Sequence, residues 1–179
     1  MRYLLLLQIL LLSGGLLFVV RKWPGGLHMT FSQHASVSRR STQFYSLLFL
    51  TTLPLLLWFF THWLVPEKHL PATFLIFAWI AVIFQILCTF VPEVGGLKTL
   101  IHRIFAGISG IALLPLVTII AFSPSASKPV QVIALSSLLL MLVILGIAFT
   151  CQKRFRWALL LQVGYYVLFF TVVVVFAYF

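Results

Sequence analysis

The chain has very little charge, and acids are its scarcest residues. Only 8% of its 179 residues are charged, and Glu67 and Glu93 are the only acids, whereas about a quarter of an ordinary soluble domain is charged. Hydrophobic residues make up 63%, with a mean hydropathy of +1.17. These values exclude a water-soluble fold. With a single acid at each of two distant positions, a catalytic carboxylate pair is excluded as well.

Other absences exclude further classes of site. The two cysteines, Cys88 and Cys151, lack the C-x-x-C spacing of thiol-disulfide exchange. No lysine lies within an apolar run, which removes a retinal Schiff base, and no charged residue lies mid-run, which weakens a charge-coupled transporter. The five histidines lie in loops or at run ends, without ligand spacing. We therefore expect neither a metal nor a haem or other cofactor.

Six uncharged apolar runs fill most of the chain. A bilayer core about 30 Å thick needs roughly 20 apolar residues per helix, and no strand-like alternation persists in any run. No A-x-A-like cleavage site follows the first run before Arg21, so this run is kept as a helix rather than a signal peptide. The sequence predicts an all-α polytopic membrane protein, in which residues 1–179 form one six-helix transmembrane domain with short loops. The predicted spans are about 3–20, 44–65, 72–91, 100–122, 130–151 and 157–179.

The positive charges are unevenly distributed between the two sides of this topology. Nine of the 12 Lys and Arg residues fall in or next to the odd-numbered loops, and three fall on the other side. Such a bias over short loops orients membrane proteins with the positive side in the cytoplasm. We therefore expect cytoplasmic odd loops and both termini outside, and the net charge of +10 indicates topology rather than nucleic-acid binding.

The polar residues of the odd loops are the candidate site. Hydroxyls of Ser32, Ser36 and Ser38 lie near Arg39 and Arg40, and hydroxyl and guanidinium groups match the oxygens of a phosphate. The third loop adds an acid, a histidine and an arginine. The candidate pocket for a lipid phosphate, a headgroup or an anionic metabolite comprises Ser32, His34, Arg39, Arg40, Glu93, His102 and Arg103. The alternative is that these basic residues only set the topology and touch anionic headgroups.

Small and kinking residues within the spans are candidates for helix packing. Ala106 and Gly110 are four apart in the fourth span, a spacing that lets a neighbouring helix approach. Pro54 and Pro115 each remove a backbone hydrogen bond inside a span, and such kinks can open a cavity. The glutamines within spans, Gln8, Gln85 and Gln162, are expected to bond helix to helix.

Two short motifs carry a family resemblance. They are Ser32-Gln33-His34-Ala35-Ser36 in the first loop, and a Pro92-Glu93-Val94-Gly95-Gly96 turn before a helix that starts Ile101-His102-Arg103. With this layout the chain resembles the small six-span prokaryotic membrane proteins of unknown function near the DRAM-like superfamily. The resemblance implies a compact six-helix bundle without established catalysis, and it supplies no site residues.

Three functions remain open from the sequence. The first is a non-enzymatic protein of the bacterial inner membrane whose basic cytoplasmic rim binds lipid headgroups or a partner, which includes a partner membrane protein or a second copy. The second is a small carrier or channel for a neutral or lipophilic molecule. The third is a lipid-modifying enzyme with His34, Glu93 and His102 as acid-base groups.

Overall fold

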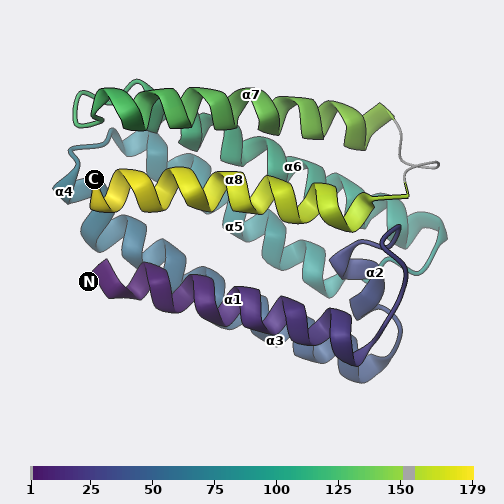
Figure 1. The fold of residues 1–179 in the computed structure, drawn as a ribbon. Coiled ribbons are helices and arrows are strands. Elements are labelled where there is room, and N and C mark those ends of the chain that lie inside the picture. Colours follow the sequence, from purple (N-terminus) through teal and green to yellow (C-terminus); the bar gives the residue numbers. More distant parts are fainter. Residues whose placement is uncertain (1, 151–155) are drawn as a thin grey trace.

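A computed structural model describes residues 2–150 and 156–179, and these residues fold as a bundle of helices (Figure 1). Six helices are long and apolar enough to cross a membrane, which confirms the predicted all-α class and number of spans. Cys151, Lys153 and Arg154 lie outside the described residues. The elements are α1 (Arg2–Lys22), α2 (Phe31–Ala35), α3 (Arg39–Phe59), η1 (Phe60–Leu64), α4 (Val65–Glu67), α5 (Ala72–Phe90), α6 (Gly96–Ala121), α7 (Lys128–Thr150) and α8 (Ala158–Tyr178).

The long helices pack in chain order. The α1 helix packs on α3, α3 on α5, α5 along α6, α6 on α7 and α7 on α8, while α8 also contacts α6 and α1. Both termini lie at the end of the bundle that carries α4, and α2 lies at the opposite end, together with the turn from α5 to α6 (Figure 1). The polar first loop and the third loop therefore meet at one end of the protein.

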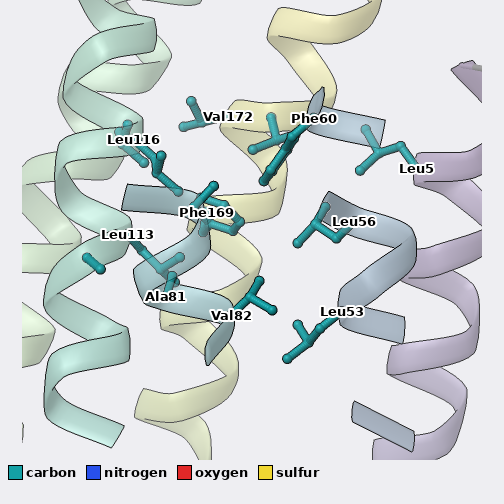
Figure 2. Close-up of a cluster of buried hydrophobic side chains, with 14 of the residues drawn as sticks. Leu5, Leu53, Leu56, Phe60, Ala81, Val82, Leu113, Leu116, Phe169 and Val172 are labelled. Atoms are coloured by element: carbon teal, nitrogen blue, oxygen red, sulfur yellow. The ribbon is translucent and has the colours of Figure 1, made fainter. Parts of the chain in front are cut away.

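All six long helices supply side chains to the buried interior. In Figure 2, Leu56, Val82, Leu116 and Phe169 point toward one another from α3, α5, α6 and α8. Leu116 is fully buried, and Phe169 is 1% exposed. Lipid tails are as apolar as these residues, so close packing rather than water exclusion holds the helices together.

The second span is longer than the predicted 44–65. It runs without a break from Arg39 to Glu67, which is 29 residues, through the π-helical turn η1. Its early start comes from a capping box, in which the side chain of Ser38 accepts from the backbone N–H of Ser41 and that of Ser41 accepts from the N–H of Ser38. A search for apolar runs misses this first turn because it contains hydroxyls and two arginines.

The predicted first loop also contains a short helix, α2. Thr30 and Gln33 form a second capping box at its start, and four of its five residues are buried. This polar segment therefore packs against the end of the bundle.

A glycine pair makes the sharp turn between α5 and α6. Gly95 has φ +100° and ψ 167°, and Gly96 has φ +57°. The first of these conformations is essentially restricted to glycine, and the second is one that side chains disfavour. The turn starts α6 at Gly96 rather than near the predicted residue 100.

Replacing Gly95 tests this turn. We expect Gly95→Ala to lower the free energy of unfolding by about 1–3 kcal/mol, because alanine must adopt a backbone conformation that it avoids. The measurement is reversible unfolding in detergent. Gly14→Ala in α1 is the matched control: nothing lies within 4 Å of its added Cβ, and an interior helical glycine-to-alanine change stabilises by about 1 kcal/mol. Equal stability of the two variants would contradict the prediction.

Candidate functional site

A cavity of about 260 Å³ opens at the end of the bundle that carries α2. Its mouth is polar and contains Ser32, Glu93, His102 and Arg103 from the candidate set. Its walls continue between α5, α6, α7 and α8. Ligand cavities usually measure about 300–1,000 Å³, so this cavity suits the polar part of an amphiphile rather than a whole lipid.

Glu93 is the centre of the polar mouth. Its side chain is 6% exposed, and Oε1 accepts from Arg103 Nε at 3.1 Å and from its terminal nitrogen at 3.0 Å. Oε2 accepts from the hydroxyls of Thr30 at 3.2 Å and Ser32 at 3.1 Å. A buried carboxylate needs such partners, and here they tie the first loop to the start of α6.

Two further contacts hold the first loop in place. The backbone N–H of Glu93 donates to the Ser36 hydroxyl at 3.1 Å, and the N–H of Phe31 donates to Oε1 of Gln162 at 3.0 Å. Ser36 and Ser38, expected in an anion-binding patch, are thus used within the protein, Ser38 as the cap of α3. Of the three serines considered, Ser32 lines the cavity.

The remaining basic candidates lie apart from the cavity. Arg39 and Arg40 are exposed on the first turn of α3 and do not line it. Arg103 does line it, and its side chain is 41% exposed. The structure therefore separates a surface rim of charge from one arginine at the mouth.

His34 is buried beside the loop and does not line the cavity. It is fully enclosed, and Nδ1 lies 2.9 Å from the carbonyl oxygen of Trp23. A carbonyl only accepts, so Nδ1 carries the proton and donates. Nε2 has no hydrogen-bond partner in residues 2–150 and 156–179.

His102 and Cys88 form a close pair that the sequence did not suggest. His102 Nδ1 donates to the carbonyl of Val91 at 2.6 Å. The sulfur of Cys88 lies 3.3 Å from Nε2 and 3.5 Å from Nδ1. If the sulfur lay in the plane of the ring at such similar distances from both nitrogens, it would overlap Cε1, the carbon between them. The sulfur therefore lies above the ring plane. This geometry does not suit proton transfer from the thiol to a lone pair of the imidazole.

Farther inside, uncharged polar groups line the cavity. Oε1 of Gln85 accepts from the Tyr166 hydroxyl at 3.3 Å, and the Ser109 hydroxyl lies 3.4 Å from the same oxygen. The Tyr165 hydroxyl donates to the carbonyl of Gly110 at 2.6 Å. Two glutamines thus bond between elements, Gln85 here and Gln162 at α2, whereas neither polar atom of buried Gln8 has a partner in the described chain.

The packing candidates take different positions around the cavity. Ala106 and Gly110 both line it, and a Cβ on Gly110 would meet Leu145 at an ordinary contact distance of 3.6 Å. Their small side chains leave space that larger residues would fill. Pro54 and Pro115 lie within α3 and α6 and do not line the cavity.

Glu93→Gln tests how the mouth is held. Loss of the carboxylate weakens charge-assisted hydrogen bonds worth about 1.5–3 kcal/mol each, so residues 28–36 should exchange their amide protons about 10- to 100-fold faster. Exchange in α5 and α8 should stay slow. Glu67→Gln, at the other end of the bundle, removes the chain's other acid and is the control. Unchanged exchange in residues 28–36 of the Glu93 variant would contradict the role given to this carboxylate.

Comparison of the chain with protein-family models, with curated proteins and with solved structures gave no match. The resemblance to six-span prokaryotic membrane proteins gains no support from them.

Proposed function

We propose that this integral membrane protein binds an anionic membrane lipid, with the headgroup at the mouth of the cavity beside Arg103. The observation that carries the proposal is the cavity itself, which joins a polar, arginine-bearing mouth to walls formed by transmembrane helices. A ligand that fits such a cavity has a charged end and an apolar end. The cavity volume leaves the rest of the acyl chains outside, along the lipid-facing helices.

The charge of this end supports an anionic ligand. Arg21, Lys22, Arg39, Arg40, Lys98 and Arg156 join Arg103 there, and Glu93 is the only acid on this side in the sequence. Exposed basic residues near an anionic leaflet contribute about 1 kcal/mol each. The rim would therefore attract anionic lipids generally, while Arg103 selects the one that enters.

The geometry favours binding over transport by a carrier or channel and over lipid modification by an enzyme. The prolines expected to shape a carrier pathway do not line the cavity. Of the proposed acid-base groups, His34 lies outside it, and both oxygens of Glu93 already accept hydrogen bonds. We therefore propose a binding role without catalysis.

Native mass spectrometry of the protein in a neutral detergent tests the proposal. We expect diacyl phosphatidylglycerol to bind at least about tenfold more tightly than diacyl phosphatidylcholine, and Arg103→Gln to remove most of this preference, because a charge-assisted contact is worth about 1.5–3 kcal/mol. Arg103→Lys should keep part of it. Lys98→Gln makes the same charge change on the same helix, away from the cavity, and should keep it fully. An equal loss in both glutamine variants would show that only surface charge matters.

We also propose that the end carrying α2 faces the cytoplasm of a bacterial inner membrane, since the excess of positive charge lies there. A reporter that is active only in the cytoplasm, fused after Phe179, should then be inactive, whereas the same reporter inserted after Gly26 should be active. The reverse pattern would overturn the orientation.

A further inference from the structure

The cavity is lined by two hydrogen-bond donors that find no acceptor within residues 2–150 and 156–179. Tyr45 lines the cavity and is 3% exposed, and its hydroxyl has no hydrogen-bond partner in the described part of the chain. Gln85 also lines it and is 6% exposed. Its Oε1 is engaged, but its amide nitrogen donates to no group within residues 2–150 and 156–179. Neither atom is among the fully enclosed unpaired atoms of the described chain, which belong to Gln8 and His34. Both donors are therefore open to the cavity and can donate to an acceptor on a ligand there.

The surroundings of these donors define the ligand group. The nearby polar residues of the cavity, Ser109, Tyr165 and Tyr166, are uncharged, and their hydroxyls already donate within the protein. The charged residues of the lining, Glu93 and Arg103, pair with each other at 3.0 Å. This part of the cavity therefore suits a neutral oxygen that only accepts, such as a carbonyl.

The distance of this part from Arg103 matches a particular part of a lipid. The Ser109 hydroxyl lies 3.4 Å from Oε1 of Gln85, and Ser109 follows Arg103 by six residues on α6, which is roughly 9 Å along the helix axis. This spacing is close to the thickness of the headgroup region on each side of a bilayer, about 5–8 Å. In a glycerolipid, the ester carbonyls lie about one headgroup thickness below the phosphate.

We propose that Tyr45 and Gln85 form a subsite for the ester carbonyl of the bound glycerolipid, which makes the protein selective for diacyl over diether lipids. This inference rests on the proposed function, because it assumes that the same lipid holds its headgroup at Arg103. It adds a second recognition point on α3 and α5, which uses neutral hydrogen bonds instead of the charge of Arg103 on α6.

A comparison of two lipids tests the subsite. Native mass spectrometry should show diacyl phosphatidylglycerol binding about 3- to 10-fold more tightly than the diether lipid with the same headgroup and chain length, the range expected for a neutral hydrogen bond or two. Tyr45→Phe removes one donor without breaking a bond within the described chain and should reduce this ratio toward one. Gln85→Met should do the same. Tyr3→Phe is the matched control. Tyr3 is exposed near the start of α1 and does not line the cavity, so this variant should keep the ratio.

The outcomes separate this inference from the proposed function. If phosphatidylglycerol binds in an Arg103-dependent way but the diether lipid binds equally well, the carbonyl subsite is wrong and the headgroup site stands. If Tyr45→Phe keeps the ester preference, the subsite is wrong as well. Soluble glycerophosphoglycerol should compete poorly, and equal competition would overturn the subsite in favour of a headgroup phosphate alone. If phosphatidylglycerol shows no preference over phosphatidylcholine, the proposed function itself fails.

Discussion

The carboxylate of Glu93 ties together the segments at the end of the bundle that carries α2. It lies at the turn between α5 and α6, accepts hydrogen bonds from Thr30 and Ser32 in the first loop, and pairs with Arg103 on α6. The first loop is far from this turn in the sequence, and no other acid is near enough to replace Glu93. The cost of burying a carboxylate is offset only if its partners stay in place. The position of α2 over the bundle, and hence the shape of the mouth, depends on this group together with the bonds that Ser36 and Phe31 make to the turn and to α8.

The lipid environment explains why the rest of the bundle needs so few polar contacts. In hydrocarbon every backbone polar group must be bonded within the chain, and helices meet that requirement locally. The long helices then pack through side chains such as Leu116 and Phe169 (Figure 2). Polar side chains inside the bundle are few, and most are paired, as Tyr165 is with Gly110. The Tyr45 hydroxyl and the Gln85 amide nitrogen, which find no acceptor in the described part of the chain, differ from this pattern, and both residues line the cavity.

The candidate site was predictable only in part, for physical reasons. Glu93, His102 and Arg103 stand near one loop in the sequence, so their proximity follows from chain connectivity. His34 and Arg39 belong to the same polar segment, yet α2 turns the histidine into the interior, and the capping box places the arginine on an exposed helical turn. Tyr45 and Cys88 had no distinguishing signal, because an aromatic residue or a thiol in an apolar span usually only fills space.

The sequence by itself determined the class of this protein and the number of its spans. Six apolar runs must become helices in a bilayer, and the uneven arginines and lysines distinguish the two ends of the bundle. The tertiary structure decided which polar residues meet, because packing against neighbouring helices sets which side of each helix faces the interior. It brought Gln85 to Tyr166, the first loop to Glu93, and small residues of α6 to a cavity wall. Composition and spacing specify length and polarity, whereas contacts between distant segments arise only when the helices have packed.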